Sequence, residues 1–466
     1  MDAANRLRPL LDAVHDTAAE VRGKCPDYFA DQPLRLDRDL LGRYGGMAGG
    51  TLARLIGETY GLTVEPADGP EALTAVDRLV AERAAGGPRA AGGPGAAGAP
   101  AAVPPEPELA AVPPESELAA VLRSVATAQQ QRDRLDRAAA ERIAARPPER
   151  TGVMGGVLHY AAAGPRREDA PPVVLLNALG MGPALWYPLM GQLAEEHRVV
   201  TWAPRGTAPG SRPLRVQDHA ADLEAVLVAE GATACHLVGW CTGPKVAMAF
   251  HRRRPDAVRS MVWLHGSFRR TDDAGGREPD TPYERNLEEL CRAVAARPTM
   301  ADTLRRIFDG GGGTDPAADP AASTGAGSDT TPETDTAPET DPYRFAEEVL
   351  ARPARALDEE LRRPFATGPV LVAYARQLLD YWADDALAHA PQVRVPVLCV
   401  GAAYDRIASP ERLAAAVDRF PDARYRHLAG ATHHSMHDRP REIAGLLTAF
   451  LRAVEPTGAP RTPAQL

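Results

Sequence analysis

Three side chains have the types and the order that nucleophilic catalysis requires. Cys241 stands in Gly-Trp-Cys-Thr-Gly, Asp405 comes shortly after the apolar run Val-Pro-Val-Leu-Cys-Val-Gly, and His433 lies in Gly-Ala-Thr-His-His. A thiol with a pKa of about 8.5 is only a few per cent thiolate at neutral pH, so it needs a base beside it. A histidine can serve as that base, and a carboxylate behind it fixes the imidazole tautomer. The three residues therefore predict a Cys-His-Asp triad for covalent acyl chemistry.

Each of these residues also has a simpler interpretation. Cys241 taken alone would be a small buried apolar residue. Asp405 could cap the helix that is expected to begin near Ser409. His434 competes with His433 as the base, because the same loop carries both. The presence of ordered partners favours the catalytic interpretation for Cys241 and Asp405.

Backbone N–H groups near Cys241 are expected to stabilise the oxyanion that acyl transfer creates. Cys241 precedes an expected helix, whose N-terminal N–H groups favour a thiolate. The N–H of Thr242 is one expected donor, and the loop after Leu-Leu-Asn should supply a second from Ala178 or Leu179. Removing one such donor typically costs about 2.7–4 kcal/mol.

Other side chains near Cys241 have open roles. Trp240 and Trp186 could line an acyl pocket, with core packing as an equal alternative. Lys245 follows Cys241 by four residues and could lower the pKa of the thiol or meet a substrate phosphate, although a solvated lysine is the simpler expectation. The five cysteines are scattered and form no CxxC pair, so we expect reduced thiols and no metal site.

The elements that must position these residues follow an α/β pattern. From residue 152 onward, short apolar runs alternate with amphipathic stretches, which predicts a mostly parallel sheet with helices on both faces. Cys241 would lie at the apex of a tight turn between a buried strand and a helix. Gly239 and Gly243 would allow that strand and helix to pack closely.

The expected α/β core is interrupted by an insertion. Residues 152–267 and 393–455 form the core, and the helical segments within 268–392 predict a lid between its strands. Inside this lid, the acidic tract 309–342 is rich in Gly, Asp, Pro and Thr and has almost no large apolar residue. Such a composition predicts disorder.

The region before the core predicts three further parts. Residues 1–84 space their apolar side chains three and four apart, which predicts a small helical accessory domain. A Pro/Gly/Ala-rich linker is expected over 85–115 and a connecting helix over 116–147. The stretch 39–64 faintly resembles a phosphopantetheine carrier domain, but it lacks the Asp-Ser-Leu attachment signal.

Charge and hydropathy argue against several classes of partner. The formal net charge is -9, and the segment 309–341 alone holds eight acidic residues with no Lys or Arg. The remaining surface therefore gives no electrostatic case for binding nucleic acid. No apolar run approaches the roughly 18 residues of a membrane span, and the first residues lack the pattern of a secretory signal. We expect a cytoplasmic protein with no bound cofactor and no membrane partner.

Four ordered motifs resemble the α/β-hydrolase superfamily over about residues 152–455. They are the loop Leu-Leu-Asn-Ala-Leu-Gly, where the family usually has His-Gly, the elbow Gly-Trp-Cys-Thr-Gly, the acid turn Gly-Ala-Ala-Tyr-Asp, and the loop Leu-Ala-Gly-Ala-Thr-His-His-Ser-Met. The resemblance implies an α/β-hydrolase fold with Cys241 as nucleophile, Asp405 as acid and His433 as base. The family's spacing favours His433 over His434.

A cysteine nucleophile favours transfer of an acyl group. A cysteine keeps the group at thioester energy, whereas a serine would convert it into a more stable oxoester, and a lid that excludes water also favours transfer. The elbow and the domain layout resemble the cysteine-containing aminoacyltransferases and type II thioesterases of nonribosomal peptide and polyketide pathways. This implies acyl or aminoacyl transfer between phosphopantetheine carrier proteins through a thioester on Cys241, in antibiotic biosynthesis. A thioesterase, a dienelactone-hydrolase-like ester or lactone hydrolase, and a non-catalytic scaffold are the alternatives.

Overall fold

The structure, a computed structural model, describes most of the chain as two compact units. The described residues are 3–45, 49–85, 115–145, 149–167, 170–268, 270–271, 277–278, 281–310 and 342–454. Nearly all of the expected linker and acidic tract lies outside them. The first unit comprises Met1–Arg137, Asp315–Ala356 and Ala429–Thr432, and the second comprises Ala138–Thr314, Leu357–Leu428 and His433–Leu466.

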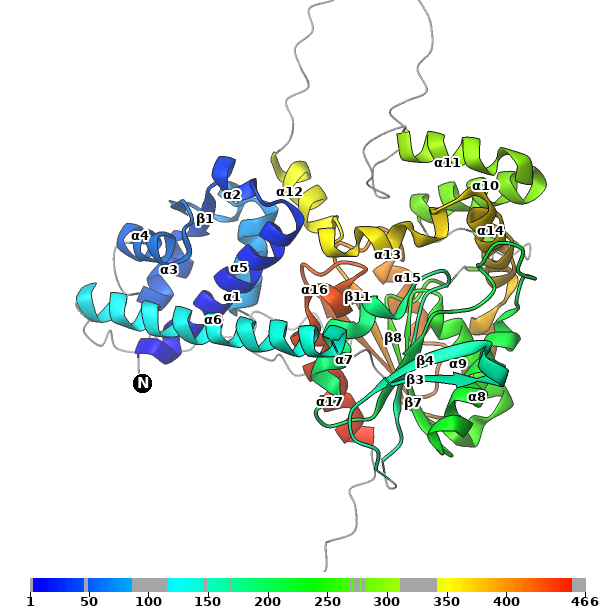
Figure 1. Ribbon diagram of the computed structural model, residues 1–466. Coiled ribbons are helices and arrows are strands. Elements are labelled where there is room, and N and C mark those ends of the chain that lie inside the picture. Colours follow the sequence, from blue (N-terminus) through cyan, green and yellow to red (C-terminus); the bar gives the residue numbers. More distant parts are fainter. Residues whose placement is uncertain are drawn as a thin grey trace, which may run out of the picture. The chain divides into compact units, whose positions relative to one another are not determined.

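The second unit is built on an eight-stranded sheet (Figure 1). Its spatial order is β12-β11-β8-β7-β5-β6-β4-β3, with β4 antiparallel to both of its neighbours and the other pairs parallel. The expected mostly parallel sheet is therefore confirmed. The strands are β3 (Glu149–Val153), β4 (Leu158–Ala163), β5 (Val173–Leu176), β6 (Val199–Trp202), β7 (Cys235–Trp240), β8 (Val258–Leu264), β11 (Val397–Ala402) and β12 (Ala423–Leu428).

The central strands are apolar on both faces because helices cover both sides of the sheet. Every residue of β5, β6, β7 and β11 is buried, which agrees with the unbroken apolar runs of these segments. Helices α8 and α9 pack together on one face, and α7 and α17 pack together on the other. The helices between and after these strands are α7 (Tyr187–Leu193), α8 (Val216–Glu230), α9 (Gly243–Arg253), α15 (Pro410–Val417), α16 (Ser435–Asp438) and α17 (Pro440–Val454).

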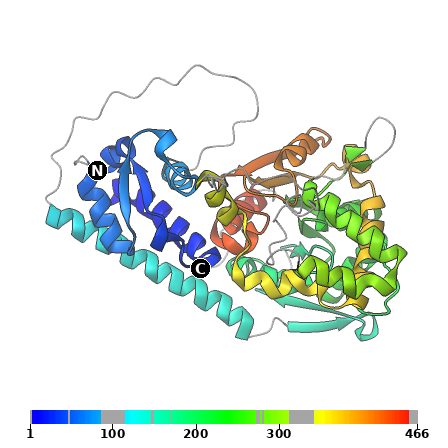
Figure 2. The same cartoon turned by 90° about the horizontal axis from the view of Figure 1, so that it is seen from above.

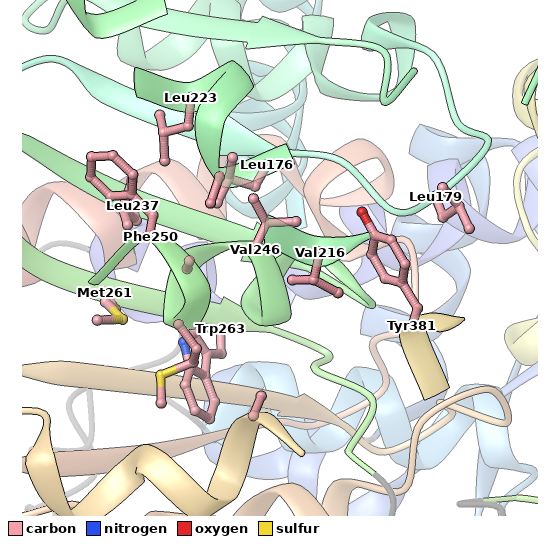
Figure 3. Close-up of a cluster of buried hydrophobic side chains, with 14 of the residues drawn as sticks. Leu176, Leu179, Val216, Leu223, Leu237, Val246, Phe250, Met261, Trp263 and Tyr381 are labelled. Carbon is pink, nitrogen blue, oxygen red and sulfur yellow. The ribbon is translucent and has the colours of Figure 1, made fainter. Parts of the chain in front are cut away.

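A buried apolar cluster joins α8 and α9 to the strands (Figure 3). Strands β5, β7 and β8 each contribute to it, and so does helix α14 (Gly368–Ala383). Burying such side chains stabilises the unit by about 1.5–3 kcal/mol each. The labelled members in Figure 3 are Leu176, Leu179, Val216, Leu223, Leu237, Val246, Phe250, Met261, Trp263 and Tyr381.

The segment between β8 and β11 is divided between the two units. It contains a short pair of antiparallel strands, β9 (Arg270–Thr271) and β10 (Arg277–Glu278), and then helices. The second unit holds α10 (Pro282–Ala296), α11 (Ala301–Gly310), α13 (Asp358–Arg362) and α14. The first unit holds α12 (Pro342–Ala351), because its apolar side chains Ala346, Val349 and Leu350 are buried and the helix packs on α1 and α5. The expected insertion over 268–392 is therefore not one continuous body.

The first unit is mainly helical, as the spacing of its apolar residues predicts (Figure 2). It also contains two short parallel strands, β1 (Leu34–Asp37) and β2 (Val64–Ala67), which the sequence did not suggest. Its helices are α1 (Ala3–Lys24), α2 (Tyr28–Asp31), α3 (Arg38–Gly45), α4 (Gly49–Tyr60), α5 (Ala75–Ala85) and most of α6 (Glu115–Ala145). Hydrogen bonds hold α6 to this unit, among them Gln129 Nε2 to Asp12 Oδ1 at 2.5 Å.

Candidate active site

Cys241 stands at the apex of a strained turn between β7 and α9. Its φ angle is +55°, a left-handed value that non-glycine residues rarely adopt. A Cβ atom on Gly239 would lie 2.6 Å from the backbone N of Pro244, and one on Gly243 would lie 2.4 Å from the backbone O of Leu176. Both flanking positions therefore need glycine for the helix to pack so closely on the sheet.

Neighbouring strand ends fix the backbone of Cys241. Its N–H donates to the carbonyl of Leu264 at 3.1 Å, and its carbonyl accepts from the N–H of Ser267 at 3.0 Å. Both partners belong to β8 or the loop that follows it, and β8 pairs directly with β7. The position of the thiol is therefore set by the sheet.

The structure brings Asp405 and His433 together at the same edge of the sheet. Asp405 follows β11 and His433 follows β12, and these two strands are parallel. Nδ1 of His433 lies 2.8 Å from Oδ2 of Asp405. Oδ1 of Asp405 accepts from the N–H groups of Ile407 at 2.9 Å and Ala408 at 2.8 Å. Asp405 therefore organises its own turn, as the capping alternative suggests, and also pairs with the histidine.

The charges of this pair favour an imidazolium beside a carboxylate. Burial lowers the pKa of His433, but the charges of Asp405 and Cys241 outweigh it and raise the pKa to about 10. Burial raises the pKa of Asp405, and His433 outweighs that effect so that the net pKa is lowered. Cys241 raises the pKa of His433 through its charge and, to a smaller extent, through a side-chain hydrogen bond, so the thiol lies beside the imidazole.

His434 has a different environment from His433. Burial, followed by the charge of His433, holds the pKa of His434 well below its usual value. Its ring centroid lies 5.6 Å from that of Trp240. Asp405 pairs with His433 and not with His434, so the geometry favours His433 as the base.

A second histidine, which motif reasoning missed, lies on the other side of Asp405. His265 follows β8, has φ +52° and is buried. Its Nε2 lies 2.6 Å from Oγ of Ser435, and its Nδ1 lies 3.5 Å from Oδ2 of Asp405. Burial lowers its pKa to about 4, so the imidazole is neutral at pH 7. The sequence feature that could have identified His265 is a polar residue directly after β8, the strand that pairs with β7.

The two tryptophans lie in the packed interior. The indole N–H of Trp240 donates to the backbone carbonyl of His433 at 2.8 Å, and the two ring centroids are 5.3 Å apart. Trp240 therefore holds the backbone of His433 in place. Trp186 is fully buried at the end of the short helical turn Pro183–Trp186. Both tryptophans are therefore packing residues in this structure, and neither is exposed as a wall of an acyl pocket.

Lys245 is not the solvated lysine that the sequence suggested. It is 2% exposed, and its Nζ donates to the backbone carbonyls of Tyr381 at 2.8 Å and Asp384 at 2.9 Å. These carbonyls lie at the C-terminal end of α14, where a cation is favoured. Lys245 therefore ties α14 to the elbow helix, and its position gives no support for contact with a substrate phosphate.

The loop after β5 contacts the elbow through a side chain. The N–H of Leu179, one of the two expected oxyanion donors in this loop, donates to Oγ1 of Thr242 at 3.0 Å. Next to it, Ala178 is buried, and Asn177 donates through Nδ2 to the carbonyl of Trp202 at 2.9 Å. The structure thus joins Leu179 to Thr242 through the hydroxyl of Thr242. The N–H groups of Thr242 and Ala178 stay predicted donors.

Two tyrosines from the inserted helices lie within electrostatic reach of Cys241. Burial is the main cause that raises the pKa of Tyr283 on α10 and of Tyr374 on α14, and Cys241 adds to both shifts. A Cβ atom on Gly180 would lie 3.1 Å from the ring of Tyr374. The ring of Tyr374 therefore packs beside the loop that carries Leu179. Helices α10 and α14 place aromatic side chains near the thiol.

A match to a known family agrees with this arrangement. A family model described as "alpha/beta hydrolase fold" matches residues 171–440, which is more than half of the chain. The chain belongs to the α/β hydrolase family. In this family the matched region contains the elbow, the acid turn and the histidine loop. Cys241, Asp405 and His433 all fall inside it.

Individual relatives of this α/β hydrolase match shorter parts of it. The putative carbamate hydrolase RutD of Pantoea ananatis is 33% identical over 113 residues, which cover 23% of this chain and 41% of that protein. The protein of the same name from Caulobacter segnis is 33% identical over 121 residues, covering 25% and 45%. The chain therefore spans less than half the length of these curated relatives.

Several solved structures are also similar to this α/β hydrolase. The haloalkane dehalogenase DbeA from Bradyrhizobium elkani has a TM-score of 0.47 and 18% identity, covering 66% of this chain and 98% of that one. A thermophilic esterase from Thermogutta terrifontis has a TM-score of 0.44 and 18% identity, covering 66% and 100%.

The described residues hold neither a cluster of metal ligands nor a membrane-spanning helix. No group of three or more His, Cys, Asp or Glu side chains among them is arranged to hold a metal ion. None of the helices described here is both long and apolar enough to cross a bilayer.

Proposed function

We propose that this α/β hydrolase is an acyltransferase that carries its acyl or aminoacyl group as a thioester on Cys241. The donor and the acceptor are the phosphopantetheine thiols of carrier proteins, and the pathway is a natural-product assembly line. The observation that carries the proposal is the thiol at the strained elbow, close to an imidazole that Asp405 holds at 2.8 Å. A thiol in this position combines covalent catalysis with an acyl intermediate that stays reactive.

The proposed reaction has two half-reactions. Sγ of Cys241 attacks the thioester carbonyl of the donor, and the resulting tetrahedral oxyanion collapses as the C–S bond to pantetheine breaks. His433 gives its proton to the leaving thiolate. The acceptor thiol then enters, loses its proton to His433 and attacks the acyl-Cys241 carbonyl, which releases Cys241. Asp405 stabilises the imidazolium throughout.

The surroundings of Cys241 support transfer over hydrolysis. Tyr283 and Tyr374 lie within electrostatic reach of the thiol, and α14 is tied to the core through Lys245. Aromatic side chains packed around an acyl intermediate would limit the access of water to it. A thioester also loses little free energy when another thiol accepts the group, so the reaction can run in both directions.

Hydrolysis is the second candidate function. The matching curated relatives are named as putative carbamate hydrolases, and water is the acceptor in such a reaction. In that case the chain would cleave carrier-bound acyl groups, or small esters and lactones, through the same acyl-Cys241 intermediate. The two candidates differ only in what attacks that intermediate.

Intact-protein mass spectrometry with a loaded carrier protein tests the proposal. We expect an acyl adduct on the wild type that disappears in Cys241→Ala and moves to a second, unloaded holo-carrier. Cys25→Ala is the matched control, because Cys25 is a partly exposed thiol of the first unit and should leave the adduct unchanged. Release of free acid at the same rate with and without the second carrier would favour hydrolysis. Failure of any carrier to acylate the protein, with rapid cleavage of small esters, would overturn the carrier assignment.

A further inference from the structure

The hydroxyl of Thr242, next to Cys241, donates no hydrogen bond to any described residue. Thr242 follows Cys241 directly and is 6% exposed. Its Oγ1 accepts the N–H of Leu179 at 3.0 Å. A threonine hydroxyl can accept one hydrogen bond and donate another at the same time. Among the described residues, however, no acceptor for the hydrogen of this hydroxyl is found. A buried donor without an acceptor is costly unless a ligand uses it.

We propose that the hydroxyl of Thr242 is a side-chain donor of the oxyanion hole. The inference rests on the proposed acyl chemistry at Cys241, and it goes beyond the backbone donors that the sequence predicts. The N–H of Leu179 acts through this hydroxyl: it polarises Oγ1, and Oγ1 donates its hydrogen to the oxyanion. The N–H of Thr242 itself provides the backbone donor from the same residue.

The step balances without any further reactant. Sγ of Cys241 forms a bond to the carbonyl carbon, and the π electrons of the carbonyl move onto its oxygen. The hydrogen of Thr242 Oγ1 forms a hydrogen bond to this oxygen but stays covalently bound to Oγ1. When the bond to the leaving group breaks, the π bond forms again and the hydrogen bond weakens. Thr242 therefore stabilises the transition state more than the ground state, which is the condition for catalysis.

A second role for the Thr242 hydroxyl, in which it blocks the oxyanion hole, predicts the opposite effect of removing it. If the hydroxyl merely fills the hole in the free protein, it competes with the oxyanion for the N–H of Leu179. Removing it would then free that N–H and speed the reaction. The two roles predict changes of opposite sign for the same substitution.

Three substitutions and a small ester separate these roles. Thr242→Val keeps the shape and removes the hydroxyl, Thr242→Ser keeps the hydroxyl, and Thr201→Val removes a buried hydroxyl on β6 that donates to the carbonyl of Leu175. The burst of p-nitrophenolate from p-nitrophenyl acetate reports acylation of Cys241 without any carrier protein. The rate of alkylation by iodoacetamide reports the reactivity of the thiol without forming an oxyanion.

The measured quantity is the ratio of the acylation rate to the alkylation rate. We expect T242V to lower this ratio by about 10²-fold, which is the loss typical of one oxyanion donor. T242S and T201V should stay within a few-fold of the wild type. Taking the ratio corrects for any loss of folded protein or of thiol reactivity. A ratio that is unchanged or higher in T242V overturns the proposal.

The outcome is separable from that of the carrier experiment. If the carrier proteins fail to acylate the chain while T242V lowers the ratio with p-nitrophenyl acetate, the carrier assignment falls and the role of Thr242 stands. If carriers do acylate the wild type and T242V transfers at the wild-type rate, the acyltransferase assignment stands and the role of Thr242 falls.

Discussion

At the scale of single residues, the protonation of His433 depends on its neighbours. Burial alone would favour the neutral imidazole, but Asp405 and Cys241 outweigh it and raise the pKa to about 10. In an unfolded chain a histidine has a pKa of about 6.5. The folded protein therefore binds this proton more tightly than the unfolded chain does.

This difference predicts how the stability of the fold depends on pH. A raised pKa contributes stability that is complete below about pH 6.5 and is lost as the pH rises toward 10. We expect the gap in unfolding free energy between the wild type and His433→Asn to shrink between pH 7 and pH 10, by about 1 kcal/mol per pH unit. Denaturant unfolding at several pH values measures it. The low pKa of His434 acts only at acidic pH and leaves this window unaffected. A gap that is constant with pH would contradict the ionised pair.

The residues that surround the triad differ in how far the sequence could identify them. Cys241, Asp405 and His433 lie in local motifs whose glycines and strand ends are visible in the sequence. His265 and Lys245 act through contacts with residues more than 130 positions away in the chain. No local pattern marks such contacts, since they depend on which strand ends and helix ends meet. The sequence therefore indicated the three residues of the candidate triad and missed the long-range contacts of His265 and Lys245.

At the scale of elements, the contact between β5 and α9 depends on Gly243. A Cβ atom there would lie 2.4 Å from the carbonyl oxygen of Leu176, which is backbone and cannot move aside cheaply. We expect Gly243→Ala to destabilise the second unit by about 1–3 kcal/mol through overpacking. Gly445→Ala on α17 is the matched control, because nothing lies within 4 Å of its Cβ position. That control should be neutral or stabilise by about 0.5–1 kcal/mol.

Thermal unfolding measures both glycine variants. The expected result is a lower melting temperature for Gly243→Ala alone, with loss of acylation at Cys241. Equal melting temperatures for the two variants would show that the elbow tolerates a wider spacing between helix and strand than its geometry suggests.

Helix α14 is held to the core by buried polar groups. Lys245 donates to the carbonyls of Tyr381 and Asp384, and Gln377 donates to the carbonyl of Arg205 at 2.9 Å. We expect Lys245→Met to destabilise the second unit by about 1–3 kcal/mol, because the buried carbonyls lose a donor. Arg252→Met on the same helix α9 is the control, since Arg252 is exposed and should change stability by less than about 0.5 kcal/mol.

Denaturant midpoints of these two variants decide the role of Lys245. If Lys245 instead binds substrate, Lys245→Met will keep the wild-type midpoint and raise only the KM for carrier-bound acyl groups. A lower midpoint together with a normal KM supports its role as an anchor of α14.

At the scale of the whole molecule, the two units each have a buried core and a buried ionic group. In the first unit, Lys24 is 4% exposed and donates to Glu20 at 2.7 Å and to the carbonyl of Leu350 at 2.9 Å. The contact with Leu350 explains why α12 belongs to this unit. The helical periodicity of α12 was visible in the sequence, but its assignment to a unit was not, because amphipathic helices do not specify which surface they cover.

Lys24 belongs to the first unit and Cys241 to the second, so a substitution at Lys24 tests whether the chemistry at Cys241 depends on the stability of the first unit. We expect Lys24→Met to destabilise the first unit by about 1–3 kcal/mol, because Glu20 and the carbonyl of Leu350 lose a buried donor while Arg83 still pairs with Glu20. Acylation of Cys241 by p-nitrophenyl acetate should stay within about twofold of the wild type. Calorimetry and the ester burst are measured on the same sample. A proportional loss of acylation would show that the first unit supports the active site directly.

The order of the strands also has a consequence for synthesis of the protein on the ribosome. Cys241 directly follows β7, which pairs with β5 and β8, whereas Asp405 and His433 follow β11 and β12, which are made much later. A growing chain therefore exposes an unactivated thiol for the time needed to add almost two hundred further residues, up to His433. In the proposed mechanism Cys241 depends on His433 for its activation, so efficient acylation must wait until translation has passed His433 and β12 has joined the sheet.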